Sequence, residues 1–220
     1  MKTFLITFVV TFSLFAISII GQLQILKPQN RDELKTQIAR IIQKQRTDKA
    51  WMSTVACPTT TMPVNGRRPS VVPDFCINTP DKCLDKCNGK DADACYFLAN
   101  LIQEHDQIDN DVAEVLYQRS CELGIVSGCT NRAANILNRN EPKGNVCAAR
   151  TFQKSCSQND PWGCTMLGLV LGEGIGMKKS VPKALASLVK ACDVAVDKNG
   201  GACKRANELH ALIERSSKSN

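Results

Sequence analysis

The feature that most constrains the fold of this chain is a cysteine pair that recurs four times along the sequence. In the first three pairs the cysteines are eight positions apart, and in the fourth they are eleven apart. The first members of successive pairs follow one another after 34, 35 and 36 residues. A period of this size is typical of an array of structural repeats. The pairs are Cys87 and Cys95, Cys121 and Cys129, Cys156 and Cys164, and Cys192 and Cys203.

The residues around each pair predict two helices joined by a short turn. In the second repeat, Ala113 and Tyr117 lie eight and four positions before Cys121, so the three side chains share one helical face. Apolar residues at helical spacing also follow the second cysteine of each pair, and the residues between paired cysteines favour turns. We therefore expect an all-α fold, an α/α superhelical solenoid of four disulfide-stapled helical hairpin repeats.

Each cysteine pair brackets a turn, so its two sulfur atoms should meet where one helix ends and the next begins. We predict a disulfide within each of the four pairs, and the chain-entropy model assigns about 2–3 kcal/mol to closing a loop of this size. Four cysteines lie outside the pairs, and they allow three full connectivities. Cys57 and Cys76 are a candidate further disulfide, while Cys83 and Cys147 are unassigned thiols. Cys83 stands where Tyr117 stands in the next repeat, which predicts that it is buried.

The N-terminus carries an uncharged apolar run from Thr3 to Gly21, which marks the chain for export. Residues 1–21 are either a cleaved signal peptide or a retained membrane anchor, because the nineteen residues 3–21 are nearly long enough to cross a bilayer. Both alternatives place the remainder of the chain outside the cytoplasm. The expected location is the periplasm or the extracellular space, where disulfides form and persist.

The rest of the chain divides into four segments. Residues 22–51 are predicted to contain an amphipathic helix over 27–51, which covers the end of the array or, alternatively, lies on an anionic membrane surface. Residues 52–78 contain four prolines and predict an irregular connector. Residues 79–215 form the repeat domain, and residues 216–220 are a C-terminal tail.

Composition excludes several functional classes. Aromatic residues make up 5% of the chain, so platforms that stack nucleic-acid bases are not expected. The net charge of +7 is mild for a chain of 220 residues and is consistent with an ordinary solvated surface. The two histidines, His105 and His210, have no ligand spacing, and only Cys83 and Cys87 are close enough in sequence to suggest a zinc site. We assign no metal and no cofactor.

Residues 164–192 resemble the Sel1-like repeat, whose pattern combines Leu-Gly, a Gly-x-Gly loop and a Lys-Ala pair that precedes a helix. The matching residues are Leu167, Gly168, Gly174, Gly176, Lys183 and Ala184. Two cysteines that bracket seven residues are the mark of the cysteine-rich branch, the Helicobacter cysteine-rich protein or hcp beta-lactamase family. The resemblance covers about residues 79–215. It implies a right-handed superhelix whose concave face contacts other proteins, and several family members carry a β-lactamase or penicillin-binding label.

Two functional classes follow from these observations. The first is an exported scaffold that binds another protein on its concave face and does not bind nucleic acid; its oligomeric state is left open. Polar residues on the helices after the second cysteine of a pair are candidates for this contact. They are Asn100, Gln103, Arg132 and Asn135.

The second class is penicillin binding or weak β-lactamase activity, and it comes from the resemblance alone. Ser-x-x-Lys occurs at Ser180–Lys183 and at Ser187–Lys190. A serine β-lactamase also needs a Ser-Asp-Asn element and a Lys-Thr-Gly element, and neither is present in the sequence. We therefore assign no catalytic residue and favour the scaffold.

Overall fold

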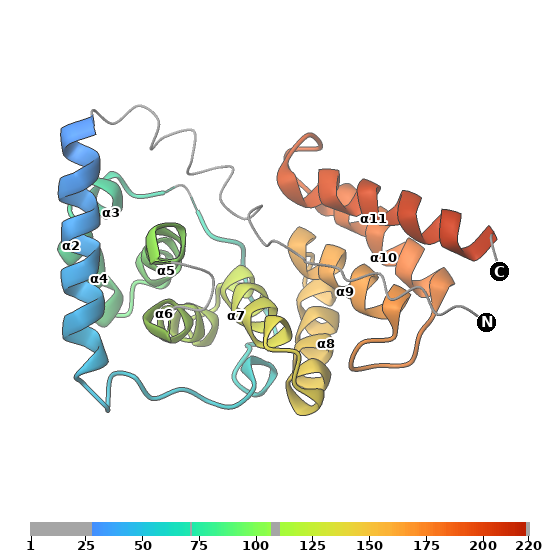
Figure 1. The fold of residues 1–220 in the computed structure, drawn as a ribbon, viewed down its shortest axis with the longest axis horizontal. Coiled ribbons are helices and arrows are strands. Elements are labelled where there is room, and N and C mark those ends of the chain that lie inside the picture. Colours follow the sequence, from blue (N-terminus) through green and yellow to red (C-terminus); the bar gives the residue numbers. More distant parts are fainter. Residues whose placement is uncertain (1–27, 71, 107–110, 219–220) are drawn as a thin grey trace.

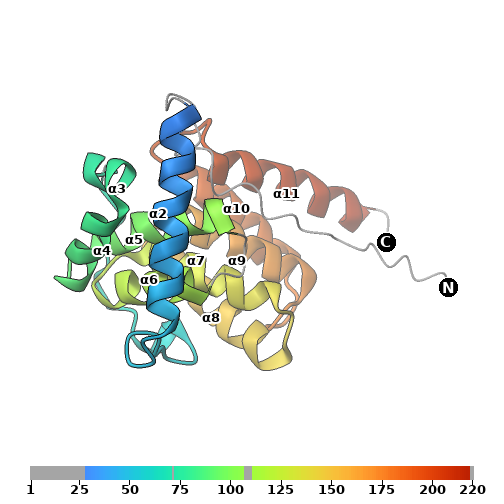
Figure 2. The same ribbon diagram turned by 60° about the vertical axis from the view of Figure 1, so that its left-hand side comes forward.

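The computed structural model describes residues 28–70, 72–106 and 111–218, and in these ranges the chain is all-helical. Helices that follow one another in the chain pack against one another, from α2 at one end to α10 and α11 at the other (Figures 1 and 2). The helices are α2 (Pro28–Arg46), α3 (Asp74–Asn78), α4 (Pro80–Asn88), α5 (Ala92–Asp106), α6 (Asp111–Glu122), α7 (Val126–Asn138), α8 (Pro142–Ser157), α9 (Pro161–Glu173), α10 (Val181–Val194) and α11 (Gly201–Lys218), with a 3-10 helix at Pro58–Thr60.

Several helix starts follow from a proline or from a capping carboxylate. Pro80, Pro142 and Pro161 each open a helix, where the missing N–H has no intrahelical partner to lose. Asp160 precedes α9 and accepts a hydrogen bond from the Gly163 N–H at 2.6 Å.

The four repeat pairs are disulfides, and each joins the end of one helix to the start of the next. Their Cα–Cα distances are 4.4–4.7 Å. The bonded pairs are Cys87–Cys95, Cys121–Cys129, Cys156–Cys164 and Cys192–Cys203. All of the chain's twelve cysteines are bonded, which indicates that the protein folds in an oxidising compartment.

The hydrophobic core consists of two large clusters, one contributed by α2 to α6 and one by α7 to α11. The positions four residues before the first repeat cysteine are buried in these clusters, with Tyr117, Phe152 and Leu188 exposed by no more than 1%. The alanines eight residues before that cysteine are completely buried, as the helical spacing requires. A third, small cluster consists of Met62, Cys121 and Cys129.

Two predicted boundaries are wrong. α2 ends at Arg46 rather than at residue 51. Two side chains after it bind the main chain and form turns: Thr47 Oγ1 donates to the Lys44 carbonyl at 2.7 Å, and Asp48 Oδ1 accepts from the Trp51 N–H at 2.9 Å. α11 continues to Lys218, through most of the expected tail from residue 216. Residues 1–27, and with them the predicted signal peptide or anchor, lie outside the described residues. No helix in the described ranges is long and apolar enough to span a bilayer.

The candidate disulfide between Cys57 and Cys76 is also wrong. Cys57 is bonded to Cys147 of α8, and Cys76 of α3 is bonded to Cys83 of α4. The reason is the path of the connector, which leaves α2 and crosses to α7 and α8 before it returns to α3 (Figure 1). Cys83 is completely buried, as its place in the repeat predicts, but it is a disulfide and not a thiol.

Candidate functional site

Three of the four predicted binding residues lie at the boundary of α5 and α7. Gln103 Nε2 donates to Asn135 Oδ1 at 3.3 Å. Asn100 Oδ1 accepts from Tyr117 Oη at 2.7 Å and from Asn131 Nδ2 at 3.2 Å. Asn131 is a partner that sequence periodicity did not single out, whereas Tyr117 was predicted only as a core residue. The polar residues at this boundary therefore bind one another, and Asn135 is only 2% exposed.

Burial keeps Tyr96 and Tyr117, the two tyrosines at this boundary, protonated and therefore neutral near pH 7. It raises the pKa of Tyr96 to about 12 and the pKa of Tyr117 well above the usual value for tyrosine. It also raises the pKa of Glu104 to about 7, and the Oε1 atom of that side chain is buried without a hydrogen-bond partner among the residues that the structure describes. The polar groups that bind one another at this boundary stabilise the contact between helices rather than presenting a reactive site.

The more informative feature is the connector itself, and we call residues 55–70 the strap. The strap runs as an irregular segment past α7 and α8 and back toward α3 (Figure 1). Cys57 and Cys147 join it covalently to α8 across a sequence separation of 90 residues. Three side chains contact the strap: Thr151 and Lys154 of α8, and Gln158 directly after that helix. One face of α8 is therefore occupied by an irregular segment of the same chain.

Most of the hydrogen bonds to the strap are made to its main-chain atoms. Lys154 Nζ donates to the Met62 carbonyl at 2.5 Å and to the Thr59 carbonyl at 3.4 Å. Gln158 uses both ends of its amide, because Nε2 donates to the Pro63 carbonyl at 3.0 Å and Oε1 accepts from the Gly66 N–H at 2.6 Å. Contacts of this kind recognise main-chain groups and depend little on the side chains of the bound segment.

The fourth predicted binding residue, Arg132, also binds the strap. Its Nη2 atom donates to the Val55 carbonyl at 2.7 Å, and its Nη1 atom donates to Gln118 Oε1. Arg132 is 4% exposed. Burial lowers the pKa of its guanidinium, but the usual pKa of arginine is so high that the group remains protonated. Gln118 Nε2 in turn donates to Thr61 Oγ1 at 2.7 Å, which adds a side-chain contact to the strap. Arg132 is thus a buried internal ligand and not a surface contact.

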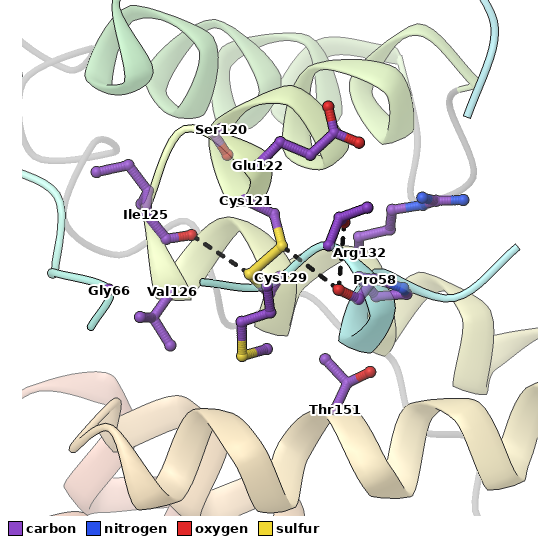
Figure 3. The surroundings of a disulfide bond; sticks show 12 residues. Pro58, Gly66, Ser120, Cys121, Glu122, Ile125, Val126, Cys129, Arg132 and Thr151 are labelled. Atoms are coloured by element: carbon purple, nitrogen blue, oxygen red, sulfur yellow. Dashed lines mark hydrogen bonds between the residues drawn. A yellow bond between two sulfur atoms is a disulfide. The ribbon is translucent and has the colours of Figure 1, made fainter. Parts of the chain in front are cut away.

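Two apolar side chains anchor the strap. Pro58 and Met62 are buried, and Met62, which is 3% exposed, packs against the Cys121–Cys129 disulfide. The Pro58 carbonyl oxygen lies 3.8 Å from Cys121 Sγ (Figure 3). The repeat disulfide therefore forms part of the surface on which the strap lies.

The far end of the strap pairs with the turn between α6 and α7. The Arg67 N–H donates to the Gly124 carbonyl at 2.8 Å, and the Val126 N–H donates to the Arg67 carbonyl at 3.0 Å, which makes an isolated parallel bridge. The Arg67 guanidinium lies 2.5 Å from Asp93. Burial raises the pKa of Asp93, but hydrogen bonds from Arg67 and Ser70 outweigh it and leave the pKa below its usual range.

A basic residue recurs two positions before the first cysteine of three repeats, as Arg119, Lys154 and Lys190. Each donates to a backbone carbonyl: Arg119 to Trp51 at 3.2 Å, Lys154 to the strap, and Lys190 to Cys156 at 2.8 Å. Arg119 also lies over the Trp51 ring at 4.4 Å. This spacing is visible in the sequence, whereas the carbonyls that the cations bind are set by the path of the connector.

The side chains of Ser187 and Lys190, one of the two Ser-x-x-Lys segments, have other partners. Ser187 Oγ donates to the Lys183 carbonyl at 2.8 Å, and the Lys190 ammonium binds the Cys156 carbonyl. Residues 28–70, 72–106 and 111–218 contain no group of three histidine, cysteine or acidic side chains that could bind a metal ion.

Comparison with known proteins adds no relative: no family model, no curated protein and no solved structure matches this chain. The strap and the face beneath it are therefore the observations from which a function can be inferred. Six side chains of α6, α7 and α8 define this strap face: Gln118, Cys121, Arg132, Thr151, Lys154 and Gln158.

Proposed function

We propose that this chain is an exported Sel1-like repeat protein, an α/α superhelical solenoid that acts as a protein–protein interaction scaffold in the periplasm or the extracellular space. One observation carries the proposal: the strap face binds an irregular polypeptide segment, which here is residues 55–70 of the same chain. Most of that contact is made to main-chain atoms. A surface that binds one such segment through its main chain is suited to binding another.

The chemistry of the face defines the segment that it would accept. Arg132 and Lys154 are cations that bind backbone carbonyls, so the partner must present carbonyl oxygens about as far apart as Val55 and Met62 present them. The pocket of Met62, on the Cys121–Cys129 disulfide, requires an unbranched apolar side chain of similar length. We infer an uncharged partner segment that adopts a similar irregular backbone and carries one such anchor residue.

The compartment supports the same proposal. Disulfides in every hairpin stabilise an array whose single hairpins bury too little surface to fold alone. A scaffold that works outside the cytoplasm needs this stability without chaperones, and the fully oxidised cysteines are consistent with it.

A synthetic peptide can test whether the strap face binds a segment in trans. The peptide spans residues 54–67 with Cys57→Ser and an N-terminal fluorophore. The protein is the full chain carrying Cys57→Ser, Cys147→Ser and Met62→Asp, which removes the covalent bond and one apolar anchor of its own strap. We expect saturable binding by fluorescence anisotropy, because the face is otherwise intact.

Matched controls identify the site. A peptide with Met62→Asp should bind at least about tenfold more weakly, since burial of a methionine side chain stabilises by roughly 2 kcal/mol. Lys154→Ala in the protein should also weaken binding, because it removes the donor to two carbonyls. Absence of binding, or equal binding of both peptides, refutes the strap face as the interaction site.

The β-lactamase label that the resemblance implies has a separate test. The purified full chain is incubated with a chromogenic cephalosporin, and we expect no turnover above the background rate, because Ser187 and Lys190 bind backbone carbonyls instead of one another. Turnover that depends on a single side chain would show that binding is not the whole function.

A further inference from the structure

The disulfide that fastens the strap differs from the other five in its exposure. Cys57 and Cys147 are both half-buried. In every other pair at least one cysteine is 4% exposed or less, and four of those five pairs are buried at both cysteines. Thiol–disulfide exchange needs access to a sulfur atom, so an external thiol reaches the Cys57–Cys147 bond most easily.

This disulfide also differs in what it connects. The other five join residues 7 to 11 positions apart, and each joins two helices that are neighbours in the chain. Cys57–Cys147 joins the strap to α8 across 90 positions. Its cleavage therefore leaves every hairpin intact and removes only the covalent bond between the strap and the strap face.

Without that bond the strap is held on the helices by noncovalent contacts alone. Its buried apolar anchors are Pro58 and Met62, and it accepts hydrogen bonds from the half-buried Lys154 and Gln158, in addition to the contacts with α6 and α7 described above. Val64 near its middle is 80% exposed. The strap remains attached to α2 and α3 at its two ends, so it can leave the face and return to it.

We propose that the Cys57–Cys147 disulfide controls access to the strap face: the oxidised chain keeps the face occupied by the strap, and reduction frees the face for a similar irregular segment of a partner protein. The reductant is an external dithiol. Its thiolate attacks one sulfur to form a mixed disulfide, and its second thiol then displaces that sulfur. The external dithiol is thereby oxidised to a disulfide, and the Cys57–Cys147 bond becomes two thiols. This proposal rests on the proposed function, because it describes regulation of the same face.

The first measurement follows the order of reduction. The oxidised full chain is treated with increasing dithiothreitol, quenched with iodoacetamide and digested for peptide mass spectrometry. We expect Cys57 and Cys147 to be alkylated at a reductant concentration at least tenfold below that needed for any other pair. Simultaneous reduction, or earlier reduction of Cys192–Cys203, overturns the proposal.

The second measurement follows the strap and the face separately. After selective reduction and alkylation, amide hydrogen exchange of residues 55–67 should become at least tenfold faster, and the fluorescent peptide should bind where it does not bind the oxidised chain. In the variant with Cys57→Ser and Cys147→Ser, residues 55–67 should exchange their amide hydrogens fast with or without reductant. In the variant with Cys192→Ser and Cys203→Ser, exchange and peptide binding should respond to reductant as they do in the natural sequence.

The outcomes separate the two proposals. If the Cys57→Ser, Cys147→Ser variant binds the peptide but reduction of the natural chain changes neither the amide hydrogen exchange of the strap nor peptide binding, disulfide control is wrong and the proposed interaction face stands. If reduction speeds amide hydrogen exchange in the strap but neither the reduced chain nor the Cys57→Ser, Cys147→Ser variant binds the peptide, the proposed function is wrong, and with it the purpose of the control.

Discussion

Removal of the Cys57–Cys147 disulfide should destabilise the protein more than removal of any hairpin disulfide. In the chain-entropy model a crosslink acts by restricting the unfolded chain, and the effect grows with the length of the closed loop. For the sequence separation of 90 residues, the model assigns about 4–5 kcal/mol, even after the disulfides inside the loop shorten it. We therefore expect Cys57→Ser with Cys147→Ser to lower the free energy of unfolding by about that amount.

Cys192→Ser with Cys203→Ser is the matched control, because this pair also has a half-buried cysteine and closes a separation of only 11 residues. The same model assigns about 2.8 kcal/mol to that loop. Neither substitution pair removes a large apolar side chain, so the difference between the variants reports loop length. That difference should be about 1.5–2 kcal/mol.

The assay is urea unfolding followed by far-ultraviolet circular dichroism, with the free energy extrapolated linearly to water. The strap variant should also have the larger increase in the slope m, since its unfolded chain expands more when the long crosslink is lost. Equal losses of stability in the two variants, or a larger loss in the Cys192–Cys203 variant, would refute the argument from loop length.

Two further substitutions test the backbone and the buried carboxyl group. Gly176→Ala should be far more destabilising than Gly124→Ala, as measured by thermal unfolding. Both glycines have positive φ, but an added Cβ at Gly176 meets the Asn145 carbonyl oxygen at 2.1 Å, whereas an added Cβ at Gly124 meets nothing within 4 Å. Because burial raises the pKa of Glu104 to about 7, its contribution to stability is complete below about pH 4 and is lost as the pH rises through 7. Glu104→Gln should therefore flatten the decline of stability between about pH 5 and 8, by at most about 3 kcal/mol, in urea unfolding at each pH; an unchanged decline contradicts the assignment.

The repeat period predicted the parts of this fold that depend on local contacts. The positions of Tyr117, Phe152 and Leu188 in the core follow from helical spacing, because residues four and eight positions apart share a face whatever lies opposite. The hairpin disulfides also follow from local spacing, because two cysteines eight positions apart remain close in space when the segment between them forms a turn.

The candidate site was predicted less well. Asn100, Gln103 and Asn135 do lie together, as residues on neighbouring helices should, but their side chains bind one another. Arg132 was expected on the surface because a charged residue usually remains in water. It is buried instead, because the strap covers it and supplies the Val55 carbonyl as a partner.

The sequence by itself determined the helical hairpins, their crosslinks and the recurring cation before the first cysteine. Only the tertiary structure decided what those cations bind, which partner Cys57 takes, and that one face of α8 is covered by residues 55–70. The physical reason is that periodic helices encode their contacts within a few residues, whereas a proline-rich connector has no period. Its path is set by the surface over which it passes, and that surface exists only when the helices have packed.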